Sequence, residues 1–124
     1  MKALELRVGT QAAAKLSSEG WHADLFDGLI GASGGPKWLI LGQMDRVLCT
    51  ELFASRTLAL PAVGSSVGSW RHALMAQLDP VAAFDRFEAA YLDQSYRSTT
   101  PKIAEITEVA AWLLRSGLGE NGER

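Results

Sequence analysis

The feature that most constrains this chain is the segment Gly64-Ser65-Ser66-Val67-Gly68, which joins an apolar run to a helical pattern. Residues 58–63 are mostly apolar and predict a short strand. An apolar spacing of four then predicts a helix that carries Trp70, Leu74 and Leu78. A Gly-x-Ser-x-Gly pattern at such a corner is typical of a sharp turn that lifts the central serine above the sheet edge. The sequence therefore predicts that Ser66 is exposed, with Gly64 and Gly68 tightening the turn.

A second glycine turn, Ser33-Gly34-Gly35-Pro36-Lys37, follows another strand candidate over residues 25–30. Beyond Lys37 the apolar residues recur at three and four, which predicts a helix over residues 38–52. Consecutive glycines let backbone N–H groups converge, so the turn suits an anion or an oxyanion. A phosphate-binding P-loop needs glycine before the lysine and serine or threonine after it, whereas Pro36 and Trp38 stand there. No dinucleotide-binding G-x-G-x-x-G pattern fits this turn either.

The order strand, glycine turn, helix, strand, serine turn, helix predicts an α/β fold with a mainly parallel sheet and flanking helices. Both special turns then fall at the carboxyl ends of neighbouring strands and face one cleft. Residues 3–8 suggest either a short edge strand or a frayed lead-in, and Thr10, Asp79-Pro80 and Thr100-Pro101 mark starts or ends of helices. So few strands leave an apolar sheet edge exposed, which predicts self-association or pairing with a chain that completes the sheet.

Length and charge narrow the classes of function. With 124 residues the chain is expected to form a single domain, and its net charge of −2 gives no reason to expect nucleic acid. No apolar run is long enough to span a bilayer and residues 1–19 contain no apolar signal segment, so we expect a cytoplasmic protein. Two histidines and one cysteine offer no metal-ligand spacing, and no cofactor is expected. Cys49 is read as a buried, small apolar residue of a helix.

Several residues have two interpretations from the sequence. Ser66 is either a nucleophile or a helix cap, while Ser65 and Ser69 are read as turn and cap residues. Trp38 and Trp70 each follow a special turn and either pack in the core or line an acyl-binding cleft. His72, six residues after Ser66, is read as a helix residue rather than a base.

Together the two turns resemble the patatin-like phospholipases and acyl hydrolases, whose signature is a glycine-rich oxyanion loop followed by a Gly-x-Ser-x-Gly elbow. The resemblance covers residues 25–77, although Ser33 and Trp38 replace the outer glycines of the family's loop. It implies Ser66 as nucleophile and the N–H groups of Gly34 and Gly35 as oxyanion donors. Lys37 and Val67 complete the expected oxyanion and ligand-binding residues. The fold it implies is part of a patatin-like three-layer sandwich, with residues 1–124 as the N-terminal half of the catalytic domain.

The resemblance also implies a Ser-Asp dyad, and here the chain departs from the family. No Asp-Gly-Gly or Asp-Gly-Ala motif follows Ser66, since Asp27-Gly28 precedes the oxyanion loop. The later aspartates Asp79, Asp85 and Asp93 lack the glycine and fall on helical patterns, where a solvated position is expected. The base is therefore expected to be missing from this chain.

The sequence favours a serine acyl hydrolase that acts on an acyl ester or lipid through an acyl-Ser66 intermediate, with peripheral membrane contact as a further expectation. Alone, the chain is expected to be weakly active or inactive. The alternative is a non-catalytic α/β module or incomplete subunit whose glycine turns bind an acyl or anionic ligand.

Overall fold

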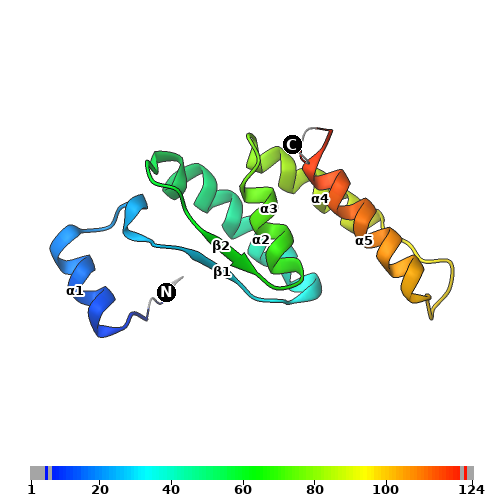
Figure 1. Cartoon of the computed structure of the whole chain (residues 1–124), viewed down its shortest axis with the longest axis horizontal. Helices are drawn as coiled ribbons and strands as arrows, with labels where there is room; N and C mark the ends of the chain where they lie inside the picture. Colours follow the sequence, from blue (N-terminus) through cyan, green and yellow to red (C-terminus); the bar gives the residue numbers. More distant parts are fainter. Residues whose placement is uncertain (1–4, 6, 121, 123–124) are drawn as a thin grey trace.

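The computed structural model describes residue 5, residues 7–120 and residue 122 of the chain. Its helices and strands follow in the order α1 Thr10–Glu19, β1 Leu29–Gly31, α2 Trp38–Val47, β2 Ala62–Gly64, α3 Val67–Met75, α4 Pro80–Asp93 and α5 Ile103–Leu118. Short 3-10 turns at Ala23–Leu25, Gly35–Lys37 and Phe53–Ser55 and a π-turn at Leu48–Leu52 complete these elements. Figure 1 shows α1 at one end of the molecule and the α4–α5 pair at the other.

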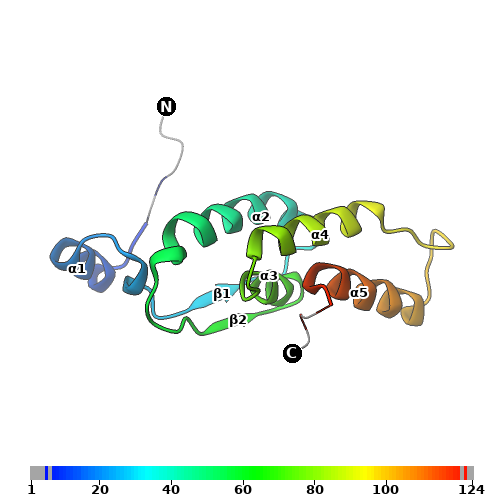
Figure 2. The ribbon, with the colours of Figure 1, turned by 90° about the horizontal axis from the view of Figure 1, so that it is seen from above.

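Strands β1 and β2 pair in parallel, with Leu29 opposite Ala62, Ile30 opposite Val63 and Gly31 opposite Gly64. The predicted α/β class with parallel strands is thus confirmed, and the fold fits a partial α/β sandwich. Helix α3 packs directly on both strands and α2 packs on α3 (Figure 2). The opposite face of the sheet is bare in the described part of the chain, because Ile30 and Val63 are 93% and 70% exposed.

The core lies among the helices rather than on the sheet. Its buried side chains come from α2, α3, α4 and α5 and are Trp38, Val67, Leu74, Ala83, Phe84, Phe87, Ala90 and Leu113. Trp38 and Phe87 pack with ring centroids 4.7 Å apart, within the range of favourable aromatic pairs. Trp38 is therefore a core residue. Burial of Trp38 fixes the position of α2, and α2 in turn fixes the glycine turn that precedes it.

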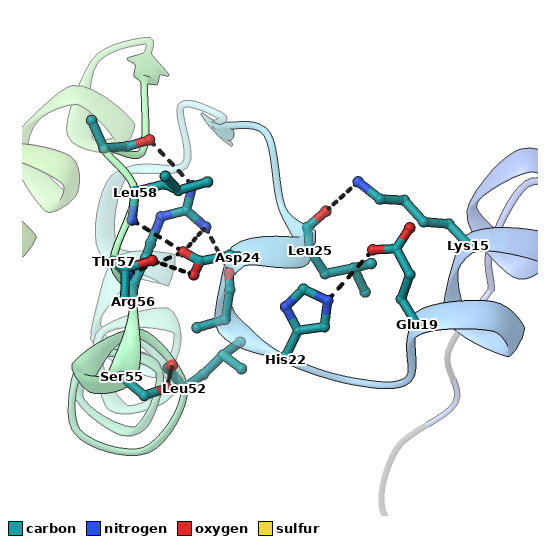
Figure 3. A network of polar contacts seen from close by, with 12 residues as sticks. Lys15, Glu19, His22, Asp24, Leu25, Leu52, Ser55, Arg56, Thr57 and Leu58 are labelled. Carbon is teal, nitrogen blue, oxygen red and sulfur yellow. Dashed lines mark hydrogen bonds and ion pairs between the residues drawn. The ribbon is translucent and has the colours of Figure 1, made fainter.

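Both strands are shorter than the sequence pattern predicts. The strand expected over residues 25–30 begins only at Leu29, and the strand expected over residues 58–63 begins at Ala62. Before the second strand, the carboxylate of Asp24 accepts hydrogen bonds from the Thr57 hydroxyl at 2.7 Å and from the Thr57 and Leu58 N–H groups at 3.2 Å (Figure 3). These N–H groups are thereby withdrawn from strand pairing, and regular pairing starts after them.

The helix ends also differ from the predicted ones. Gly9 rather than Thr10 occupies the N-cap of α1, and Lys102 rather than Thr100 occupies that of α5. In the first turn of α5, the carboxylate of Glu105 accepts the Arg97 N–H at 2.7 Å and ties the preceding turn to the helix. The helix expected to continue from α2 to residue 52 changes to a π-turn at Leu48. The edge strand expected over residues 3–8 lies largely outside the described residues, and Glu5, Arg7 and Val8 are not in a strand.

Candidate functional site

The turn between β2 and α3 has an unusual backbone at Ser66. Its φ of 53° and ψ of −130° make it the one non-glycine residue with positive φ in the part of the chain that the structure describes. Side chains rarely adopt such angles, and residues held in them cluster at functional sites. Ser66 occupies the N-cap position of α3, but its side chain makes no capping hydrogen bond. The interpretation of Ser66 as a capping residue therefore does not explain its conformation.

Close packing of backbones holds the turn in this shape. The Ser65 N–H donates to the Gly31 carbonyl at 2.9 Å and ties the turn to the end of β1. A Cβ on Gly68 would collide with the carbonyl oxygen of Gly31 and lie 2.5 Å from its carbon, and a Cβ on Gly64 would lie 2.6 Å from the Gly68 carbon. Both motif glycines are thus needed because β1, the turn and α3 approach closely, as the sequence predicted for Gly64 and Gly68.

Ser66 is exposed and opens into a hollow of about 190 Å³, called here the serine hollow. One side of it is formed by Gly35, Ser66 and Val67. The remaining lining comes from α3 to α5 and the segment between α4 and α5, and consists of Trp70, Tyr91, Gln94, Tyr96, Ile106, Ala110 and Leu113. The two special turns therefore meet at one hollow, as their positions after parallel strands predict.

Two residues that line this hollow, Gly35 and Val67, have backbone N–H groups without a hydrogen-bond acceptor among the described residues. Gly35 has a φ of 51° and begins the 3-10 turn Gly35–Lys37, whose Lys37 N–H donates to the Gly34 carbonyl at 3.3 Å. Within the described residues, the N–H groups of Gly34, Gly35 and Val67 donate no hydrogen bond. Gly35 and Val67 line the serine hollow, whereas Gly34 and Lys37 do not. Two free N–H donors beside an exposed serine hydroxyl form an arrangement able to hold an oxyanion.

The two tryptophans that follow the special turns have different positions. Trp38 is fully buried in the core. Trp70 is half-buried, lines the serine hollow, and stands edge-on to Phe87 with ring centroids 5.8 Å apart. Trp70 is thus available to a ligand in the hollow, and Trp38 is not. The sequence did not single out Tyr91, Gln94 and Tyr96 as site residues, because only the packing of α4 and α5 beside α3 brings them there.

Within the described residues, the lining of the serine hollow includes no aspartate, glutamate or histidine that could serve as the base of Ser66. Asp79 caps α4 by accepting the Ala82 N–H at 3.0 Å. Asp85 pairs with Arg46 at 2.8 Å. The ring of His72 instead lies against Gly31, where a Cβ would be 2.8 Å from its Cε1 atom. Asp79 and Asp85 thus have partners of their own, and the His72 ring is not part of the lining of the serine hollow.

The described residues offer little for metal binding, for spanning a membrane or for thiol chemistry. They contain no group of three or more histidine, cysteine, aspartate or glutamate side chains arranged to hold a metal ion. None of their helices has the length and apolarity needed to cross a bilayer. Cys49 lies half-buried in the π-turn, and burial, followed by the nearby Asp45 charge, raises the pKa of its thiol to about 11. The thiol therefore stays protonated and weakly nucleophilic at neutral pH.

Comparison of the chain with protein-family models, with curated proteins and with solved structures finds no match in any of the three. Inference about function thus depends on the geometry of the two turns and of the serine hollow.

Proposed function

We propose that this chain carries the nucleophile and the oxyanion donors of a serine acyl hydrolase. The observation that supports the proposal most strongly is the backbone of Ser66, whose φ of 53° is held by close packing and is not explained by side-chain capping. A serine forced into a strained strand-to-helix turn presents its hydroxyl away from the backbone, where a substrate carbonyl can approach. This geometry, together with the motif order, also supports placing the chain in a patatin-like fold.

The proposed chemistry is acyl transfer to Ser66. The hydroxyl oxygen attacks the ester carbonyl carbon, its proton passes to a base, and the carbonyl oxygen takes up negative charge. The N–H groups of Gly35 and Val67, with Gly34 beside them, supply donors for that charge. The alcohol then leaves, and water hydrolyses the acyl-Ser66 ester. The base has no candidate in the lining of the serine hollow, so it is proposed to come from outside the described residues.

Labelling with a fluorophosphonate tests the nucleophile, because this reagent forms a phosphonyl ester with an activated serine. We expect the wild-type chain to be labelled at pH 8 to 9 and peptide mass spectrometry to place the adduct on Ser66. Ser66→Ala should remove the label. Ser65→Ala is the matched control, since Ser65 is adjacent and exposed but has no positive φ, and this variant should retain the label.

Two results would contradict the proposal. One is labelling that persists in Ser66→Ala. The other is a wild-type chain that, even after prolonged incubation at pH 8 to 9, where hydroxide can replace the missing base, reacts no faster than Ser66→Ala.

A second function is favoured by the lack of an acidic or histidine side chain in the lining of the serine hollow. In this alternative, the chain is a binding module or incomplete subunit that holds an acyl or anionic ligand at the same N–H groups without turnover. A slowly hydrolysed ester distinguishes the two: it should acylate Ser66 in the first case, and in the second it should bind reversibly with no mass change in the protein.

A further inference from the structure

The serine hollow has a lining without charged side chains. Among the described residues that form it there is no lysine, arginine, aspartate, glutamate or histidine. Its polar side chains besides Ser66 are Tyr91, Gln94 and Tyr96, and the Gln94 amide nitrogen already donates to the Tyr91 carbonyl at 2.8 Å. A charged group that enters such a space loses hydration and gains no charged partner, which is costly. The part of a ligand that occupies the hollow is therefore expected to be neutral.

Part of the lining belongs to the buried helical core. Leu113 of α5 and Val67 of α3 are only 3% and 5% exposed, and α5 lies along α4 and touches α3 (Figure 2). By contrast, Tyr96 and Ile106 are 40% and 43% exposed, so the hollow opens to water beside them. The alcohol of an ester has to leave into water, whereas the acyl group stays bonded to the serine in the intermediate. We therefore expect the acyl group to lie against the core and the alcohol to face the opening.

Aromatic contacts with the core hold the walls of the hollow. Trp70 stands edge-on to Phe87 with ring centroids 5.8 Å apart, and Tyr91 stands edge-on to Trp38 at 5.4 Å. On the α5 side, Ala110 lies on the same face of the helix as Ile106 and Leu113, which are four residues before it and three after it. Ala110 is the smallest side chain of this wall, so it leaves the room that the hollow offers.

The volume of the hollow limits the length of the acyl group. A methylene group is about as large as a water molecule, which takes up about 30 Å³ in the liquid. The hollow, at about 190 Å³, therefore holds about six such groups. Carbons beyond about the sixth would extend into water, where they gain no further burial.

We propose that the serine hollow selects a short, uncharged acyl group of about four to six carbons, and that Ala110 sets this length. The inference rests on the proposed acyl transfer to Ser66 and specifies its substrate. In the reaction, a bond forms between Ser66 Oγ and the carbonyl carbon, and the bond from that carbon to the alcohol oxygen breaks. The alcohol oxygen leaves with the electron pair, and the Ser66 proton goes to the base, a role that hydroxide takes in the assay below.

A series of p-nitrophenyl esters with one common leaving group tests the length. Acetate, hexanoate and decanoate esters, each below its aggregation concentration, are compared at pH 8 to 9 by release of p-nitrophenolate, and intact mass measures the acyl-protein formed. The rate of Ser66→Ala is subtracted, and each difference is divided by the rate of the same ester with hydroxide. We expect the corrected rate to rise at least tenfold from acetate to hexanoate, and to change less than threefold from hexanoate to decanoate.

A charged ester of equal length tests the neutral lining. The mono-p-nitrophenyl ester of adipic acid has the same six carbons as the hexanoate ester but ends in a carboxylate. We expect it to acylate Ser66 at least tenfold more slowly than the hexanoate ester does. Equal rates for the two esters would overturn the proposal.

Variants on α5 test the role of Ala110. Ala110→Leu should reduce the advantage of hexanoate over acetate to less than twofold, while acetate reacts as in the wild-type chain and thereby shows that the turn is intact. The matched control is Ala104→Leu, at an exposed position of α5 outside the lining, which should keep the tenfold advantage. Circular dichroism checks folding, and Ile106→Trp, at the more exposed rim, makes the same test if Ala110→Leu does not fold. A full hexanoate advantage in the folded variants would overturn the role of this wall.

The outcomes separate this inference from the proposed function. Acylation of Ser66 at corrected rates that do not depend on chain length would overturn the inference and leave the nucleophile in place. A corrected rate that keeps rising at least tenfold from hexanoate to decanoate would do the same, and would indicate a long-chain lipid as substrate. Absence of any Ser66-dependent acylation with all of the esters would overturn the proposed function, and the inference with it.

Discussion

At the scale of single residues, Ser66 has the most informative position in the molecule. Its hydroxyl is free of capping, its φ is positive, and both neighbouring glycines are held by contacts with backbone atoms. Strain of this kind has an energy of about 1–3 kcal/mol and persists only where the surrounding structure imposes it. The backbone at Ser66 can therefore be tested by stability measurements alone, without any substrate.

We expect Ser66→Gly to be more stable than Ser66→Ala by about 1 kcal/mol, because glycine adopts positive φ without the steric cost that alanine retains. At ordinary positions the order is reversed, since glycine loses more entropy on folding, about 0.5–1 kcal/mol relative to alanine within a helix. Urea denaturation measures both values. Ser69, in the first turn of α3, provides the control pair, in which the alanine variant should be the more stable. An alanine advantage at Ser66 would mean that the turn is not strained.

His72 gives a residue-scale prediction about pH. Burial and the Arg71 charge lower its pKa below the ordinary value of 6.5, and the Asp45 charge opposes them. Since the unfolded chain then binds this proton more readily than the folded chain, stability is complete above about pH 6.5 and declines as the pH falls below it. Urea denaturation between pH 7.5 and 5.0 should show this decline, and His72→Gln should flatten it. An unchanged slope in His72→Gln would assign the decline to other groups.

At the scale of elements, the serine turn was predictable because its determinants are local. Two glycines at fixed spacing, an apolar run before them and an apolar period of four after them occur within about twenty residues. The hydrogen bonds that precede β2 were not predictable, because Asp24 binds Thr57 and Leu58 more than thirty residues along the chain. The full lining of the serine hollow escaped the sequence for a similar reason, since Tyr91, Gln94 and Tyr96 lie far along the chain from Ser66.

One buried ion pair links α2 to α3. Asp45 is 2% exposed and accepts two hydrogen bonds from Arg71, at 2.6 Å from Nε and 2.7 Å from Nη2. Breaking such a pair leaves a buried charge, so Asp45→Asn should lower the free energy of unfolding by about 3 kcal/mol. Asp85, which pairs with Arg46 but has a side chain that is 63% exposed, is the control. Asp85→Asn should cost less than about 1 kcal/mol in the same urea titrations. Similar losses in the two variants would show that Asp45 is not the main link between these helices.

At the scale of the whole molecule, the helices form a closed core while the two-stranded sheet has one bare face. The helical core contains the fully buried Trp38, Leu74, Phe84 and Phe87. Ile30 and Val63, paired across the strands, are exposed on the other face, and Leu58 nearby is 62% exposed. An isolated pair of short strands is marginal in water, so most of the stability has to come from the helices. The serine hollow lies between the two parts, since Val67 and Leu113 of the helical core and Gly35 and Ser66 of the turns after the strands line it.

The bare sheet face gives a prediction about association. Contiguous exposed apolar residues on a sheet with open edges favour contact between chains, so the 13.4 kDa chain should sediment above its monomer mass as its concentration rises. Replacing both Ile30 and Val63 with threonine keeps strand propensity and removes apolar surface, and should return the chain toward monomer in sedimentation equilibrium. Ile103→Thr with Leu92→Thr is the matched control, because these residues are 83% and 69% exposed but lie on α5 and α4. A wild-type chain that remains monomeric at every concentration would contradict the prediction. A helical control that dissociates the chain as fully as the strand variant would move the contact from the sheet to the helices.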